Sequence, residues 1–286
     1  MANVHVITDS TADIPDSLRE ELDIGMVPLK VHLGNQSFLD RVNIYPQEFY
    51  KRLQELDDLP TTSQPSPIDF VEAFREAVRE EDKDILSIHL SSSFSGTYQA
   101  AVLAQSMVED ELKVTVIDSK KASFAIGLVV VEVARAAKAG KSIDECVELA
   151  HQLIQEQEVY FLVDSLEYLQ KGGRIGKASA VLGSLLNIKP ILSLNEEGVV
   201  YPLDKVRGKN KAMAKIQELL REKFGDQPVQ AAILCTNNEG EGDQWVVKLK
   251  DQFNIHEIIR AEIGPVVGSH VGPGTLAVAL QPVLRK

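Results

Sequence analysis

The chain has 286 residues, of which 44% are hydrophobic and 25% charged, as in an ordinary globular protein. Its net charge of −12 argues against a nucleic-acid binder, which needs a basic surface, and against general attraction to anionic membranes. The two cysteines, Cys146 and Cys235, lie far apart and suit buried thiols in a reducing cytosol. We therefore expect a cytoplasmic protein of two domains, without a signal peptide, a membrane span or a metal site.

The first half alternates predicted strands and helices. The pattern predicts strands at residues 4–8, 26–33, 84–90 and 113–118, a short helix opened by Pro15, and helices at 45–56, 68–79, 98–108, 123–139 and 142–155. Residues 61–67 are predicted to form a loop. Such alternation is typical of βαβ units, so we expect a mostly parallel sheet with helices on both faces.

The second half follows a different pattern. Its predicted elements are strands at 159–164, 231–236, 255–262 and 275–280, a hairpin of 190–194 and 199–203 around a four-residue loop, and a helix at 209–224. A hairpin inside an α/β pattern indicates a mixed sheet with helices. We therefore predict two α/β domains, residues 1–157 and 158–286.

Three hydroxyl-rich stretches lie next to predicted elements of the first half. They are residues 9–11, 61–63 and 91–97. The first and third follow strands, and ligands of parallel α/β sheets bind beyond the carboxyl ends of strands. Hydroxyls and helix N-terminal amides together suit an anionic head group. The alternative is that these Ser and Thr residues only cap helices.

His270 and a set of cations complete the candidate site. His270 lies in a glycine-rich segment, residues 263–275, where it could donate a hydrogen bond to a carboxylate or be satisfied by the backbone. Arg174, Lys205 and Arg207 stand out in an acidic chain. They are predicted to meet an acidic partner or a phosphate group, and the alternative is a solvated face.

The motifs that carry these residues resemble the DegV family, over essentially the whole chain. They are residues 7–13, 61–65, 91–98, 172–175 and 264–274. Within that family the chain is similar to the FakB-like, fatty-acid-binding subunits of bacterial fatty acid kinase.

The resemblance implies a carrier with no catalytic residue and no cofactor of its own. It implies that the carboxylate of a bound fatty acid is held by Thr62, Ser63, Ser93 and His270, with the Phe94 amide as a donor. Arg174 would dock to the kinase subunit, which uses ATP to make an acyl phosphate for phospholipid synthesis. We expect a monomer with only transient membrane contact.

The same resemblance places the acyl chain between the two domains and inside the second. The ligand would be an acid such as palmitate, stearate or oleate. Residues 124–137 and 180–186 are apolar and could line the chain, although ordinary core packing explains most of them. Phe94 stands where the family often has leucine, which would alter chain preference.

Two other functions remain open from the residues. A lipid-active serine hydrolase would use Ser93 and His270 with Asp9 as the orienting acid, although no GxSxG motif is present. A phosphometabolite-binding α/β enzyme would use the hydroxyl-rich loops for phosphate.

Overall fold

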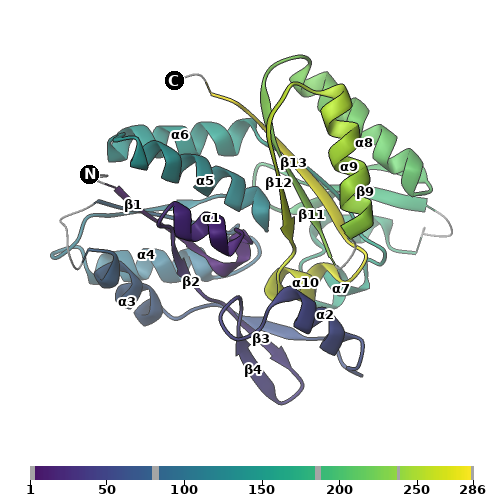
Figure 1. Cartoon of the computed structure of the whole chain (residues 1–286). Coiled ribbons are helices and arrows are strands. Elements are labelled where there is room, and N and C mark those ends of the chain that lie inside the picture. The colour runs from purple at the N-terminus through teal and green to yellow at the C-terminus, as the bar shows by residue number, and fades with distance from the viewer. Residues whose placement is uncertain (1–3, 79–83, 184–187, 237–238, 285–286) are drawn as a thin grey trace.

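The computed structural model describes residues 4–78, 84–183, 188–236 and 239–284, which form three sheets with helices packed around them (Figure 1). The first sheet is wholly parallel, as predicted for the first half. Its strands, in spatial order, are β2 (Gly25–Val27), β1 (Val4–Asp9), β6 (Asp84–His89) and β7 (Val114–Asp118).

The second sheet has six strands and is mixed, which confirms the prediction for the second half. Its spatial order is β10 (Val200–Arg207), β9 (Ile188–Leu194), β8 (Glu158–Leu162), β13 (Leu276–Pro282), β11 (Val229–Cys235) and β12 (Ile255–Glu262). Among the described residues of this sheet, only β11 and β12 pair in parallel. The predicted hairpin is β9–β10, and its strands extend beyond the predicted bounds.

A third, antiparallel sheet was not predicted. It consists of β4 (Gln36–Leu39), β3 (Lys30–Leu33) and β5 (Thr61–Ser63). The prediction of one strand over residues 26–33 is wrong, because the chain leaves the parallel sheet at Pro28, which has no N–H for a ladder. The prediction of a loop at 61–67 is wrong in part, because Val31 pairs with Thr62 across the chain.

The helices follow the predicted pattern closely in the first half. They are α1 (Asp16–Glu21), α2 (Pro46–Leu53), α3 (Pro67–Ala77), α4 (Thr97–Met107), α5 (Phe124–Lys138) and α6 (Ile143–Glu156). Capping boxes at Ser66 and Ser142 start α3 and α6. Arg79, the predicted end of α3, lies outside the described residues.

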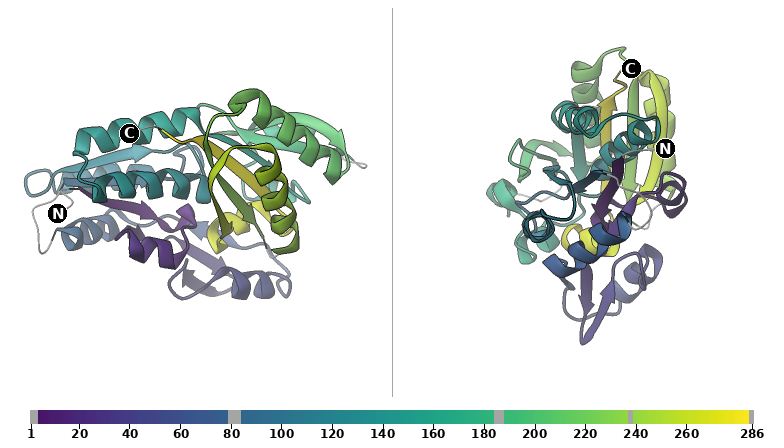
Figure 2. Two further views of the ribbon diagram at one scale, coloured as in Figure 1. Left: turned by 45° about the horizontal axis from the view of Figure 1, so that its top comes forward. Right: turned by 90° about the vertical axis from the view of Figure 1, so that its left-hand side faces the viewer.

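Helix α5 lies between the two large sheets, which explains its apolar sequence. Every residue from Phe124 to Val131 is buried, and the helix contacts β1 and β6 on one side and β11 on the other. Helices α3 and α4 cover the opposite face of the parallel sheet, so this sheet has helices on both faces as predicted (Figures 1 and 2).

The second half contains helices that the sequence did not reveal. Its helices are α7 (Glu167–Lys171), α8 (Lys209–Phe224), α9 (Glu239–Gln252) and α10 (Pro265–Val271), of which only α8 was predicted. Helices α8 and α9 cover the outer face of the mixed sheet (Figure 1). None of the described helices is long and apolar enough to span a membrane.

The predicted boundary near residue 157 falls between α6 and β8. All strands of the first sheet precede it in the chain. Across it, however, the core is continuous: Val6, Val133, Leu234 and Ala279 belong to one buried cluster. The division into domains 1–157 and 158–286 therefore stays a prediction. Both cysteines are buried, and neither forms a disulfide bond within the described part of the chain, as expected.

Candidate functional site

A cavity of about 380 Å³ lies where the three sheets meet. Its volume falls within the range of small-molecule sites in proteins. Apolar side chains of the mixed sheet line one end, and most of the cavity's polar side chains, which come from loops of both halves and from α10, gather at the other. The cavity therefore has two chemically different ends.

The apolar end is built on one face of the mixed sheet. Its lining includes Val159, Phe161, Leu194, Val200, Leu234 and Ala277. Side chains alternate along a strand, so Val159 and Phe161 of β8 face the cavity while Tyr160 and Leu162 pack beneath α8. The helical stretch 124–137 contributes only Ala125, and Val181 and Leu182 are not part of the lining. Residues 184–186 lie outside the described residues.

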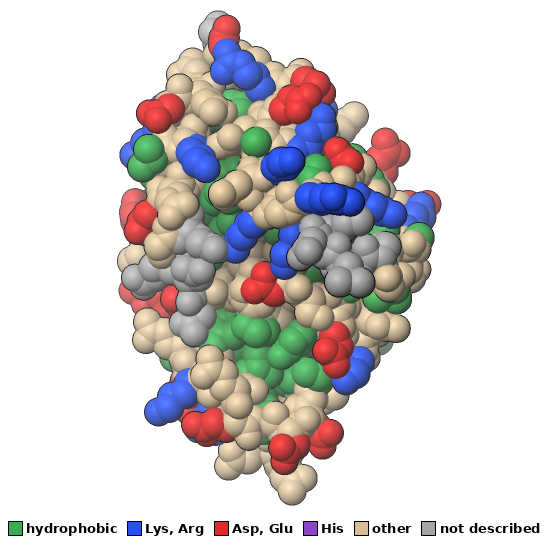
Figure 3. Space-filling view, turned by 90° about the vertical axis from the view of Figure 1, so that its right-hand side faces the viewer, with side chains coloured by type: hydrophobic (Ala, Val, Ile, Leu, Met, Phe, Trp, Pro, Cys, Tyr) green, Lys and Arg blue, Asp and Glu red, His purple; other side chains and the backbone are tan. Residues whose placement is uncertain are grey.

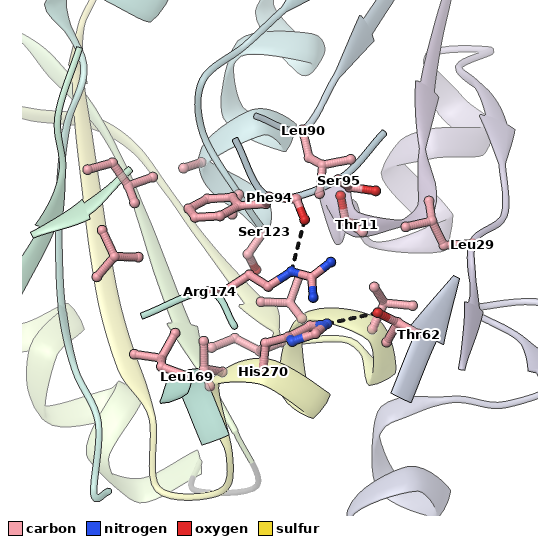
Figure 4. A pocket seen from close by; sticks show the side chains of 18 of the residues that line it. Thr11, Leu29, Thr62, Leu90, Phe94, Ser95, Ser123, Leu169, Arg174 and His270 are labelled. Carbon is pink, nitrogen blue, oxygen red and sulfur yellow. Dashed lines mark hydrogen bonds between the residues drawn. The ribbon is translucent and has the colours of Figure 1, made fainter. Parts of the chain in front are cut away.

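The polar end gathers side chains from several distant segments (Figure 4). Its lining includes Thr11, Thr62, Ser63, Gln64, Ser95 and Ser123, together with Arg174 and His270. Thr11, Ser95 and Ser123 follow β1, β6 and β7, the carboxyl ends of adjacent parallel strands. The structure thus brings the three predicted hydroxyl-rich stretches to one cavity.

His270 lies on α10 and forms a 2.8 Å hydrogen bond from Nε2 to the Thr62 hydroxyl. Burial, with a smaller contribution from Arg174, lowers the pKa of His270 to about 4, so the imidazole is neutral at pH 7. If Nε2 carries the proton, it donates to Thr62 and leaves the Thr62 hydroxyl proton free for an anion. Gly172 packs against the ring, since a Cβ there would lie 2.5 Å from Nδ1.

The glycine-rich segment around His270 contains a helix, α10, that was not predicted. Pro265 follows the N-cap Gly264 and starts a helix, because proline favours the first helical position. Gly268 lets this helix pack closely, since a Cβ there would lie 2.4 Å from the Tyr50 hydroxyl. Tyr50 in turn donates to the carbonyl of Ile263.

Arg174, predicted to meet an acidic partner or a phosphate group, lines the cavity beside His270. Its Nε donates to the Phe94 carbonyl at 2.9 Å (Figure 4). One Nη donates to the Gly172 carbonyl at 2.6 Å. These bonds fix a half-buried guanidinium at the polar end. A cation there favours an anionic ligand.

Two predicted head-group contacts are placed otherwise. Ser93 is exposed and not among the cavity-lining residues, and its hydroxyl donates to the Glu197 carbonyl in the β9–β10 turn at 2.7 Å. The Phe94 N–H already donates to the Ser91 carbonyl, and the Phe94 ring is among the side chains that line the cavity (Figure 4). The serine that does line it is Ser95, two residues further along the same turn.

Lys205 and Arg207 are exposed on β10, an edge strand, and are not among the cavity-lining residues. Figure 3 faces the side on which β9 and α8 lie in Figure 1, and Lys and Arg side chains gather there above a hydrophobic area. Their role toward a partner stays a prediction.

The triad required for a serine hydrolase is not assembled. Ser93 is bonded away from His270, and Asp9 is fully buried, with its carboxylate 3.0 Å from Nδ1 of His89. Asp9 also accepts the backbone N–H groups of Thr11 and Leu90, two residues of the cavity wall. Its role is therefore to hold the cavity loops in place, which the sequence did not indicate.

A second buried carboxylate, Asp13, joins the three sheets beneath the polar end. It pairs with Arg41 at 3.1 Å, accepts the Gly264 N–H at 3.0 Å and accepts a hydrogen bond from Ser123. Burial raises the pKa of Asp13, and Arg41 opposes that shift. Ser123 has a φ of 56°, a conformation that costs free energy. Contacts such as the hydrogen bond to Asp13 offset this cost.

Known proteins are similar to this chain in architecture and in sequence. The model of a family described as "Uncharacterised protein, DegV family" matches residues 3–283. The chain belongs to the DegV family. This confirms the resemblance seen in the motifs, over nearly the whole chain.

Solved structures of DegV proteins superpose closely on this chain. A DegV family protein from Thermus thermophilus, described as fatty acid binding, is 37% identical, with a TM-score of 0.91 over 98% of this chain and 100% of that one. DegV from Bacillus subtilis, described as a fatty acid binding protein, is 34% identical, with a TM-score of 0.90 over 99% and 100%. A DegV family protein from Ruminococcus gnavus, described with vaccenic acid, is 25% identical, with a TM-score of 0.85 over 97% and 99%.

Proposed function

We propose that this chain binds one long-chain fatty acid in the cavity and presents its carboxylate to a partner kinase. The observation that carries the proposal is the division of one cavity into an apolar end on the mixed sheet and a polar end on the loops. The DegV proteins described as fatty acid binding support it, because they share the fold and more than a third of the sequence.

The apolar end supplies the affinity in this proposal. Burial of a methylene group contributes about 0.8 kcal/mol, so a sixteen-carbon chain contributes up to roughly 12 kcal/mol. The wall of Val159, Phe161 and Ala277 gives an acyl chain no polar group that would need a partner. Palmitate, stearate and oleate are all candidate ligands.

The polar end supplies the orientation. A buried carboxylate is costly unless it is hydrogen-bonded, and the hydroxyls of Thr62, Ser63 and Ser95 can donate to it. Arg174 adds a positive charge, and His270 positions the Thr62 hydroxyl. Ser93 contributes indirectly, by holding the turn that carries Phe94 and Ser95.

Titration of the delipidated protein with palmitate, stearate and oleate tests the binding step. We expect one site per chain and a much lower affinity for phosphometabolites such as sugar phosphates, because most of the cavity lining is apolar. Absence of binding by all three acids would overturn the proposal and favour the phosphometabolite alternative.

Presentation to a kinase is the second step of the proposal. The polar end of the cavity reaches solvent at Gln64, which is exposed, so the carboxylate would lie near the surface. A partner kinase could then phosphorylate it with ATP to give an acyl phosphate, while this chain acts as a monomeric, cytoplasmic carrier without a cofactor of its own. Membrane contact would be transient.

Reconstitution with a fatty acid kinase catalytic subunit tests this step. Oleate-loaded protein, kinase and ATP should yield an acyl phosphate that hydroxylamine traps as a hydroxamate. Lys205→Glu and Arg207→Glu should lower this yield without lowering oleate binding, because both residues are exposed and outside the cavity lining. An unchanged yield in both variants would remove them from the partner surface.

Arg174 needs a separate measurement, because it lines the cavity. Arg174→Glu should weaken oleate binding as well as phosphorylation, since it replaces a cation near the carboxylate by an anion. Full oleate affinity with lost phosphorylation would instead place Arg174 in the kinase interface.

A further inference from the structure

Gln64 occupies a distinctive place at the polar end of the cavity. Among the described residues that line the cavity, it alone is exposed, while its neighbours Thr62 and Ser63 are half-buried. It directly follows β5 and precedes the buried Pro65, which fixes the backbone on its far side. The side chain thus stands between solvent and the place of the head group.

The Gln64 carboxamide lies on Gly96, the N-cap residue of α4. A Cβ added to Gly96 would lie 2.2 Å from Oε1 and 2.7 Å from Nε2 of Gln64. Gly96 has a φ of −73°, which any residue can adopt, so the backbone conformation does not require glycine here. Glycine is needed because a side chain would occupy the space of the Gln64 carboxamide. The glycine therefore provides the seat for the carboxamide.

This seat puts the carboxamide next to Ser95, whose side chain lines the same cavity. Within the part of the chain that the structure describes, no hydrogen bond holds the Gln64 carboxamide, and nearly all the other polar groups at this end are bonded to protein. A carboxamide carries two N–H donors. Gln64 thus has two N–H donors at the mouth of the cavity that no described residue accepts.

We propose that Gln64 is a specificity residue for the ligand head group, which rests on the fatty-acid-binding function proposed above. Its Nε2 donates a hydrogen bond to a carboxylate oxygen from the solvent side, opposite the donors Thr62 and Ser95. A neutral amide at this position favours an ionised acid over the uncharged alcohol of the same chain, because hydrogen bonds to charged groups are stronger. A partner that displaces this exposed side chain would uncover the carboxylate.

The test compares two ligands on three proteins. Affinities for oleate and for oleyl alcohol are measured with wild type, Gln64→Glu and Gln99→Glu. Gln99 is an exposed residue of α4 that does not line the cavity, so its variant has the same added charge on the same part of the surface. We expect Gln64→Glu to weaken oleate binding about tenfold or more, with little change for the alcohol and little change for either ligand in Gln99→Glu.

Other outcomes would distinguish a failure of the Gln64 inference from a failure of the proposed function. Equal losses for oleate and alcohol in Gln64→Glu would show a structural effect and overturn the inference, as would an unchanged oleate affinity. If wild type binds neither ligand, the proposed function itself fails, whatever the variants do.

The Gly96 seat gives an independent check by a double-mutant cycle. Gly96→Ala should weaken oleate binding in the wild-type background, because the Cβ displaces the Gln64 carboxamide. The same change should cost little in a Gln64→Ala background. An equal loss in both backgrounds would mean that the Cβ acts on the cavity directly and that Gln64 is not the residue it displaces.

Discussion

The two ends of the cavity are built in opposite ways. The apolar end rests on one face of a six-stranded sheet, where Val159, Phe161 and Ala277 come from strands that the whole core supports. The polar end consists of loops and short elements from distant parts of the chain. The buried carboxylates of Asp9 and Asp13 join these segments through hydrogen bonds and an ion pair.

This difference separates two kinds of sensitivity. At the apolar end, binding depends on the volume that the sheet leaves free, and any side chain of suitable size would serve. At the polar end, binding depends on the position of a few donors, so residues that never touch a ligand can decide it.

The largest expected effect is a loss of stability on substitution of Asp13, which joins the segments of the polar end. Asp13→Ala should lower the free energy of unfolding by about 3–5 kcal/mol, because it removes the carboxylate that pairs with the buried Arg41 and accepts the Gly264 N–H. Urea unfolding measures this. Asp226→Ala is the matched control, since Asp226 is 97% exposed and its ion pair with Arg221 contributes little. Equal, small losses in both variants would contradict the assigned role of Asp13.

A volume change tests the apolar end. Ala277→Phe should weaken binding of a sixteen-carbon acid about 100-fold, because a ring that displaces roughly four methylenes removes about 3 kcal/mol of burial. A ten-carbon acid, which needs less room, should lose much less. Val247→Phe, on the exposed surface of α9, is the control. If Ala277→Phe bound both acids as tightly as wild type does, the acyl chain would have to lie elsewhere in the protein.

His270 makes stability at the polar end dependent on pH. Its pKa is about 4 in the folded protein and about 6.5 in the unfolded chain, so the unfolded state binds more protons between these values. Stability should therefore be complete above pH 6.5 and fall by about 3 kcal/mol as the pH drops to 4. The measurement is the difference in urea unfolding between wild type and His270→Asn. A difference that does not change with pH would refute the assigned burial.

The smallest effect distinguishes two serines of one turn. Ser95→Ala should weaken oleate binding up to about tenfold, because it removes a donor from the cavity. Ser93→Ala should change it by less than about twofold, because the Ser93 hydroxyl bonds Glu197 outside the cavity. The reverse order would restore the sequence-based assignment of Ser93.

The sequence predicted the elements whose patterns are local. Helix α8 and strand β12 have the predicted bounds, and the alternation of the first half gave the parallel sheet correctly. The antiparallel sheet was not predicted because β5 has only three residues and depends on pairing with β3, where Val31 lies opposite Thr62 from a distant part of the sequence. Helix α10 was not predicted because glycines are typical of loops. Here Gly268 instead allows the helix to pack closely against Tyr50.

The site was predictable at the level of segments, not of every side chain. Strand ends located the hydroxyl-rich loops, and Thr62, Ser63, Arg174 and His270 all line one cavity. Which serine of residues 91–95 faces inward depends on the β9–β10 turn, which binds Ser91 and Ser93 from the other side. No spacing within the segment encodes that contact.

The central claim is that this cavity holds a fatty acid, and native mass spectrometry of the purified protein tests it most directly. The predicted result is a chain that carries one additional mass, identified after solvent extraction as a long-chain fatty acid. A protein that is empty as purified, and that stays empty after incubation with palmitate or oleate, would contradict the account.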